Sequence, residues 1–243
     1  MQYFGGKQKI SNELSQFLNN QLKDDQPFVD LFCGSCNVIS KINADRIRIA
    51  NDKHQYLISM WKDLQTGVAL PQELTDVQYQ YISKHLEDNP GLSGFVGFGC
   101  SFSGKWLGGY ARSGERNYCL NAYNSTMKKF ETLDTVQFYN LDYRDVFIPE
   151  GSLVYCDIPY KNTTQYSVKE VGEFNHDEFY QWVKDNSSKY DIYISEYLEN
   201  KPAGFGIVWQ KGSKQDIKNK TGKKAKTNEI VIQYENNELG MAI

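Results

Sequence analysis

The sequence has no apolar run long enough to cross a membrane. Its 243 residues contain no stretch of about 18 apolar residues, and the opening MQYFGGKQKI lacks the apolar region of a secretory signal. Its five cysteines are odd in number and lack the spacing of a disulfide framework. We therefore expect a soluble protein of the cytoplasm, with reduced thiols and no membrane partner.

Clusters of metal-binding residues are also missing. Cys33 and Cys36 form a C-x-x-C pair, but the sequence has no second such pair. Because the pair lies between a predicted strand and a predicted helix, we interpret both cysteines as small turn residues and not as a metal or redox site. His54, His85 and His176 are scattered, and none lies beside a serine or cysteine nucleophile motif. The sequence therefore predicts structural roles for these side chains and no metal site.

Positive charge is scarce overall but concentrated in two places. The formal net charge is −3, yet residues 211–226 contain seven lysines against one acid, and residues 100–130 contain five basic residues against one acid. The rest of the chain is therefore strongly acidic, and the two basic patches suit a polyanion bound at one face. The alternative for residues 211–226 is a solvated lysine-rich loop.

Apolar runs bounded by turn residues alternate with helical patterns along most of the chain. This alternation is typical of a parallel sheet with crossover helices, and therefore of an α/β fold. We expect strands at 28–32, 46–50, 136–139, 152–156 and 191–195, an antiparallel pair at 206–209 and 229–234, and helices at 38–42, 56–64 and 174–184. Residues 66–133, rich in tyrosine and glycine, interrupt the pattern. We therefore predict a core of residues 1–65 and 134–243 with an inserted domain.

A glycine turn and two acids lie where the first two strands end. Asp30 and Gly34 belong to the first of these segments, and Asp52 follows the second strand. Ligands of an open parallel sheet bind outside the carboxyl ends of its strands, where glycine lets the backbone approach them. A carboxylate at that place can accept hydrogen bonds from ribose hydroxyls. The pattern indicates a nucleotide-like ligand, but a single glycine after a strand is also ordinary turn chemistry.

The tetrapeptide Asp157-Ile158-Pro159-Tyr160 directly follows the predicted strand 152–156. An exocyclic amine is hard to methylate because its lone pair is delocalised into the ring, and acceptors that hold the amino protons free that lone pair. Asp157 and the main-chain carbonyl of Ile158 offer two such acceptors. Pro159 fixes the turn, and Tyr160 offers a face on which a flipped base can stack. The alternative is an ordinary Asp/Pro turn.

Together these segments resemble the Dam-type DNA adenine methyltransferases of the D12 class, particularly the phage-encoded members. The resemblance lies in five segments in the family's order: Tyr3-Phe4-Gly5-Gly6-Lys7, FVDLFCGS, IANDKHQYLISMWKDL, Leu141-Asp142-Tyr143 and VYCDIPY. It implies a Rossmann-like, S-adenosylmethionine-dependent methyltransferase core and a mainly helical target-recognition domain in the insertion. It also implies site-specific methylation of adenine N6 in duplex DNA by base flipping, with S-adenosylhomocysteine as product, in a bacterial or phage-infected cell.

The resemblance also assigns roles to single residues. The cofactor-binding residues that it implies are Tyr3, Lys7, Asp30, Phe32, Gly34, Asp52, Asp142 and Tyr143, and the catalytic residues are Asp157, Ile158, Pro159 and Tyr160. For DNA binding we expect an insertion that contacts bases and a carboxyl-terminal lysine loop that holds phosphates. The residues concerned are Lys105, Arg112 and Arg116 in the insertion, where Arg116 follows a predicted hairpin tip, and Lys220, Lys223 and Lys224 in the loop.

The sequence departs from the family pattern in two places. Ile158 stands where the family usually has proline, although the role implied there needs its carbonyl oxygen alone, and related RNA adenine methyltransferases resemble Asn-Ile-Pro-Tyr. Cys36 replaces the last glycine of the first motif, and it adds a side chain where the methionine part of the cofactor would pass. The alternatives are N4-cytosine or RNA adenine methylation, and a nucleic-acid-binding relic of the fold with weakened catalysis.

Overall fold

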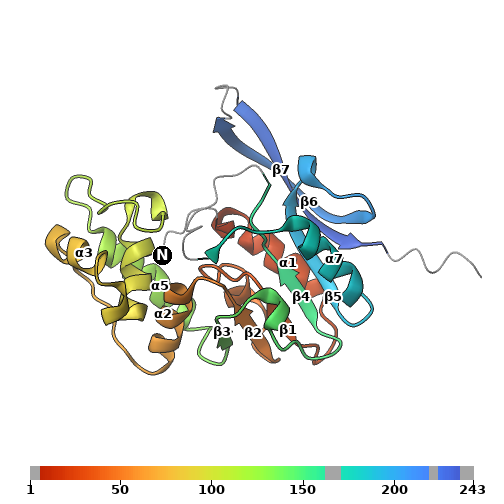
Figure 1. Ribbon diagram of the computed structural model, residues 1–243, viewed down its shortest axis with the longest axis horizontal. Coiled ribbons are helices and arrows are strands. Elements are labelled where there is room, and N and C mark those ends of the chain that lie inside the picture. The colour runs from red at the N-terminus through yellow and green to blue at the C-terminus, as the bar shows by residue number, and fades with distance from the viewer. Residues whose placement is uncertain (1–5, 162–170, 219–223, 236–243) are drawn as a thin grey trace, which may run out of the picture.

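The computed structural model describes residues 6–161, 171–218 and 224–235, with side chains described outside 212–227. Its strands form one sheet in the order β3-β2-β1-β4-β5-β7-β6 (Figure 1). Strands β1 to β5 pair in parallel, and β7 runs antiparallel to both β5 and β6. The strands are β1 (Phe28–Asp30), β2 (Arg48–Asn51), β3 (Gln137–Tyr139), β4 (Leu153–Cys156), β5 (Asp191–Tyr197), β6 (Phe205–Lys218) and β7 (Lys224–Tyr234). The order reverses between β1 and β4, which confirms the predicted Rossmann-like α/β fold.

The sheet buries side chains on both faces, because successive residues of a strand point to opposite sides. Along β4, Leu153 and Tyr155 join a hydrophobic cluster with α1 and α2, whereas Val154 and Cys156 join a second cluster with α7. One face is therefore covered by α1 and α2, and the other by α7. The main helices are α1 (Ser11–Gln21), α2 (Gln55–Gln65), α3 (Asp76–Ile82), α4 (Pro90–Gly94), α5 (Tyr118–Phe130) and α7 (His176–Asn186).

The helix expected at 38–42 is wrong. After β1 the chain makes tight turns and then a single 3-10 turn, η2 (Ile39–Lys41). Gly34 and Cys36 have left-handed backbone angles, with φ of 49° and 57°. A helix cannot continue through such residues, so the apolar spacing of residues 38–42 reflects core packing, not a helical turn.

The segment 66–133 is mainly helical and lies to one side of the sheet (Figure 1). Its helices have clear start signals: Thr75 and Gln78 form a capping box at α3, and Asn117 caps α5. Gly94 lets α4 pack closely on α2, since a Cβ there would lie 2.0 Å from the carbonyl oxygen of Tyr56. One hydrophobic cluster runs from this segment into the sheet. Its role as a separate recognition domain stays a prediction.

The antiparallel pair near the carboxyl end is longer than expected. Both strands extend into the lysine-rich run, with Asp216 opposite Lys226 and Lys218 opposite Lys224. The expected lysine-rich loop is therefore largely part of a long hairpin. None of the helices among the described residues is long and apolar enough to cross a membrane.

Candidate functional site

The carboxyl ends of β1, β2 and β4 bring three carboxylates together. Asp30 ends β1, Asp52 follows β2 and Asp157 follows β4. Asp30 interacts electrostatically with the other two, so the three groups lie close to one another. They flank the point where the strand order reverses, which is where sheets of this kind bind their ligands.

Lys7 lies at the centre of a buried polar cluster beside Asp157. It begins the short helix η1 (Lys7–Lys9), and its side chain is 5% exposed. Its Nζ lies 2.7 Å from Asp157 Oδ1 and 2.8 Å from Glu229 Oε1. Lys7 Nζ also donates to the Tyr160 hydroxyl, which in turn donates to Glu229 Oε1. The structure thus joins the amino-terminal motif to the tetrapeptide, and it adds a second carboxylate from β7.

The charges of this cluster depend on one another. Burial opposes the charged form of Lys7, but Asp157 and Glu229 raise the Lys7 pKa above its ordinary value. For Asp157, burial raises the pKa to about 6, Lys7 acts in the opposite direction, and Glu229 adds to the rise. Burial also raises the pKa of the Tyr160 hydroxyl. At neutral pH the cluster therefore holds Lys7 as an ammonium and Asp157 as a carboxylate.

The tetrapeptide loop is held from two sides. The Nε2–H of His176, at the start of α7, donates to the Pro159 carbonyl at 2.7 Å. The ring of Tyr160 lies 4.3 Å from that of Tyr197, at the end of β5. Among the described residues, no group donates a hydrogen bond to Oδ2 of Asp157 or to the Ile158 carbonyl. Within the described part of the chain, two acceptors at the start of this loop therefore have no hydrogen-bond donor.

The glycine loop carries an unsatisfied carboxylate oxygen. Oδ1 of Asp30 is buried and has no hydrogen-bond partner among the described residues. Burial, followed by Asp157 and Asp52, raises the pKa of Asp30 well above its usual range. A cationic ligand group here would relieve this unfavourable burial. The α-ammonium group of S-adenosylmethionine suits that position chemically.

Asp52 is tied to the glycine loop by backbone hydrogen bonds. Its Oδ2 accepts from Gly34 N at 2.8 Å, and its Oδ1 accepts from His54 N at 2.9 Å. The carboxylate is thus fixed in direction and retains lone pairs for ribose hydroxyls. Asp30, Gly34 and Asp52 thus lie together at the ends of β1 and β2, and their role in cofactor binding stays a prediction.

The remaining cofactor residues also come together. The rings of Phe32 and Tyr143 lie 5.7 Å apart in an aromatic group on the α7 side of the sheet. The carboxylate of Asp142 is held by Lys53 at 3.1 Å and by Nε of Arg144 at 2.7 Å. Hydrogen bonds from Arg144 are the main cause that lowers the Asp142 pKa to about 2. Asp142 is therefore bound to two cations, which would compete with a cofactor amine. Tyr3 lies outside the described residues.

Cys36 does not project into this site. Its side chain is fully buried and belongs to the hydrophobic cluster on the α1 side of the sheet. The crowding of the cofactor expected from this side chain stays a prediction. Cysteine in place of glycine instead adds backbone strain of about 1 kcal/mol.

The predicted DNA-binding residues lie in different surroundings. Arg112 is exposed and pairs with Asp76, with 3.4 Å between Nη1 and Oδ2. Arg116 is exposed after a turn at Gly114, and its guanidinium lies 5.7 Å from the centre of the Tyr118 ring. That turn leads directly into α5 and is not a hairpin tip between strands. Lys105 is half-buried. Lys220 and Lys223 lie outside the described residues, and so does the side chain of Lys224.

The structure places three further residues at the site. Glu229 lies on β7, Asn51 ends β2 and His176 begins α7. Asn51 is buried, and its side chain bonds to Leu31 and Leu141, so it joins the ends of β1 and β2 to the segment after β3. The strand prediction at 229–234 placed Glu229 at a strand end. Its partner Lys7 could not be inferred, because the contact depends on β7 entering the sheet beside β5.

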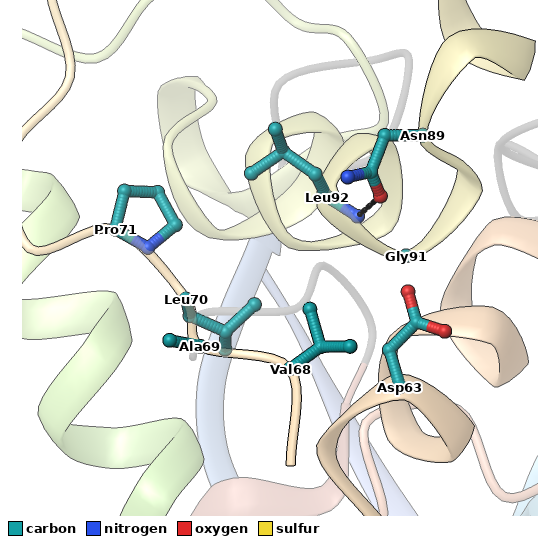
Figure 2. Close-up of a pocket in the computed structure, with 8 residues that line it drawn as sticks. All are labelled: Asp63, Val68, Ala69, Leu70, Pro71, Asn89, Gly91 and Leu92. Carbon is teal, nitrogen blue, oxygen red and sulfur yellow. Dashed lines mark hydrogen bonds between the residues drawn. The ribbon is translucent and has the colours of Figure 1, made fainter. Parts of the chain in front are cut away.

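A separate pocket lies between α2 and α4, away from the strand ends (Figure 2). Its lining includes one ionisable side chain, Asp63, and none of the predicted site residues. Among the described residues, no group of three or more His, Cys, Asp or Glu side chains is arranged to hold a metal ion.

The amino-terminal part of the chain matches a known family. Residues 3–91 fit the model of the D12 class N6 adenine-specific DNA methyltransferases. The match covers less than half of the chain, and over these residues the chain is similar to this class. The matched region contains Lys7, the glycine loop and Asp52, three of the elements that meet at the site. The family supports an adenine-specific DNA methyltransferase, with S-adenosylmethionine as the methyl donor that such an enzyme implies. No curated protein matches the sequence.

Solved methyltransferase structures are among those to which this chain is similar. The rRNA methyltransferase AviRa from Streptomyces viridochromogenes has 13% sequence identity and a TM-score of 0.44, over 96% of this chain and 87% of that one. A precorrin-6y methyltransferase from Geobacter metallireducens has 9% identity and a TM-score of 0.35, over 92% and 87% of the two chains. Neither similarity bears on the substrate, and the fold assignment rests on the strand order.

Proposed function

We propose that this D12 class methyltransferase transfers the methyl group of S-adenosylmethionine to adenine N6 in duplex DNA, on a base flipped out of the helix. The observation that carries the proposal is the pair of available acceptors at the start of the tetrapeptide loop. Asp157 Oδ2 and the Ile158 carbonyl lie beside the carboxylates that fit the cofactor. Two acceptors match the two protons of an exocyclic amine.

Asp157 and the Ile158 carbonyl activate the amino group of the substrate. Bound S-adenosylmethionine supplies an electrophilic methyl group on a sulfonium. Asp157 and the Ile158 carbonyl accept the amino protons, so that the nitrogen lone pair turns from the ring toward the methyl carbon. The lone pair forms the new N–C bond as the C–S bond breaks and its electrons return to sulfur. N6 then loses one proton to solvent or to Asp157.

Lys7, Glu229 and His176 hold this loop in place. Lys7 pairs with Oδ1 of Asp157 and so leaves Oδ2 for the substrate, with the carboxylate in one orientation. Glu229 is the second anion of Lys7 and the acceptor of the Tyr160 hydroxyl. His176 fixes the carbonyl of Pro159. Tyr160 supplies the aromatic face for the flipped base.

Radiolabel transfer from S-adenosylmethionine to duplex DNA, single-stranded DNA and RNA tests the proposal, with the modified base identified after nuclease digestion. We expect N6-methyladenine in duplex DNA. Asp157→Ala should abolish transfer and leave cofactor affinity within a few-fold of wild type, while Asp157→Asn keeps a trace of activity because its amide oxygen still accepts a hydrogen bond.

Each other product contradicts the proposal in a specific way. N4-methylcytosine or methylated RNA as the product would show that the substrate is not adenine in duplex DNA. Cofactor binding without transfer to any substrate would indicate a relic of the fold. Near-normal turnover of Asp157→Ala would overturn the role of the carboxylate.

A further inference from the structure

Lys129, in the last turn of α5, faces the glycine loop and not the solvent. Its Nζ donates to the Ser35 carbonyl at 2.7 Å and lies 3.4 Å from the Ser35 hydroxyl. The two residues are 94 positions apart in the sequence. Lys129 thus lies in the basic stretch 100–130 of the sequence. In the structure, however, its side chain contacts the glycine loop.

The ammonium of Lys129 lacks a negative partner. Among the described residues, no acidic side chain forms an ion pair with it. Burial is the main cause that lowers the Lys129 pKa to about 8, with Cys36 acting in the opposite direction and the nearby Lys41 adding to the fall. A largely buried cation without a counter-ion is unfavourable, and an anionic ligand would stabilise it.

The charges of S-adenosylmethionine complement the charges around the loop. The molecule has two cationic groups, the sulfonium and the α-ammonium, and one anionic group, the carboxylate. Asp30, Asp52 and Asp157 place three carboxyl groups close together, and a cationic ligand group would favour their ionised forms. Lys7 is already paired with Asp157 and Glu229, so it is not free for the carboxylate. Of the described lysines that contact the loop, the half-buried Lys129 is the one that remains.

We propose that Lys129 is a cofactor-binding residue, whose ammonium binds the carboxylate of the methionine part of S-adenosylmethionine at the glycine loop. The inference rests on the proposed function, because it assumes that the loop binds this cofactor. It adds a residue from the segment 66–133 to a site otherwise made by the core. A second contact supports the placement: Thr132, just after α5, donates from its hydroxyl to the Ser40 carbonyl at 2.8 Å.

Calorimetric titration with two ligands tests the assignment. S-adenosylmethionine contains the carboxylate, whereas 5′-methylthioadenosine has the same adenine and ribose without the amino-acid part. We expect Lys129→Met and Lys129→Gln to weaken S-adenosylmethionine binding about tenfold, the loss of one charge-assisted hydrogen bond, and to leave 5′-methylthioadenosine affinity within twofold. Lys129→Arg, which keeps the charge, should retain most of the affinity.

Lys128→Met is the matched control, because Lys128 is the exposed neighbour on the same helix turn. It should bind both ligands as wild type does. Unchanged S-adenosylmethionine affinity in Lys129→Met would overturn the assignment, and so would an equal loss for both ligands, which would indicate a general disturbance of the loop. Binding of 5′-methylthioadenosine also shows that each variant is folded. If the wild-type protein bound neither ligand, the proposed function itself would fail.

Discussion

At the scale of single residues, Asp157 acts as part of a group of four side chains. Its carboxylate touches Lys7 and Tyr160, and both of these touch Glu229. Glu229 therefore influences the reaction without touching the substrate. Its negative charge raises the pKa of Asp157, while the positive charge of Lys7 lowers it.

The acid limb of the pH profile should report this group. Asp157 must be ionised to accept an amino proton well, so the single-turnover rate should fall as the pH drops below about 6, the pKa of Asp157. Glu229→Gln removes the anion that raises this pKa, and we expect the acid limb to move to lower pH. Rates measured between pH 5 and about 8 decide the question. An acid limb at the same pH in both proteins would contradict the coupling.

Asp52 offers a second test at this scale. Asp52→Ala should weaken S-adenosylmethionine binding by about 1 to 3 kcal/mol, because a charged acceptor for the ribose is lost. The substitution also removes the acceptor of the hydrogen bonds that the backbone amides of Gly34 and His54 donate to Asp52. Titration calorimetry measures the change. An unaltered dissociation constant would remove Asp52 from the cofactor site.

At the scale of elements, Asn51 fastens the strand ends that form the site. Its buried amide makes three hydrogen bonds, to Leu31 and to the backbone of Leu141. We expect Asn51→Ala to lower the free energy of unfolding by about 3 kcal/mol, since one buried and two part-buried backbone groups lose a partner. Asn140→Ala, which removes one exposed side chain with a single bond to Asp52, is the control and should cost less than about 1 kcal/mol. Urea denaturation that gives equal values would contradict this role.

The elements also show which parts of the molecule follow from sequence patterns. Buried parallel strands appear as short apolar runs, so β1, β2, β4 and β5 could be predicted within two residues. The helix prediction at 38–42 failed for a local reason. The apolar spacing there suits a helix, but it gives no sign of the left-handed backbone angle of Cys36. The site was predictable where motifs adjoin strands, as at Asp52 and Asp157. Glu229, His176 and Lys129 were not, because long-range packing brings them there.

The basic residues of the insertion should differ in their effect on DNA binding. Arg112 pairs with Asp76 on the surface, whereas Arg116 forms no ion pair with a described acid. We therefore expect Arg116→Ala to narrow the difference in affinity between cognate and non-cognate duplexes by about 1 to 3 kcal/mol, and Arg112→Ala to change it less. Binding to matched duplexes at two salt concentrations measures both. Equal losses on the two duplexes for Arg116→Ala would contradict a base contact.

The lysines expected to hold phosphates give the contrasting case. Replacing Lys220, Lys223 and Lys224 by alanine should weaken binding to all duplexes equally and flatten the salt dependence, because phosphate contacts carry no base information. The same two duplexes and salt concentrations serve as the assay. A loss confined to the cognate duplex would show that the hairpin takes part in base recognition.

At the scale of the whole molecule, one hydrophobic cluster joins the helical segment to the sheet. It contains Tyr79 and Phe95 from the segment and Phe28 and Leu153 from the sheet. We expect a single cooperative transition in scanning calorimetry, because neither part keeps a complete core without the other. Two resolved transitions would show that the segment folds independently. S-adenosylmethionine should raise the midpoint of the transition by mass action.

The contact between α5 and the glycine loop limits how such enzymes can exchange specificity. Lys129 and Thr132 come from the end of the segment 66–133, yet they bind Ser35 and Ser40 of the core. A chimera that takes the whole of residues 66–133 from another methyltransferase would lose both contacts unless the donor supplies them. A junction placed before Lys129 would keep Lys129 and Thr132 of the recipient protein. Their hydrogen bonds to Ser35 and Ser40 would then be preserved.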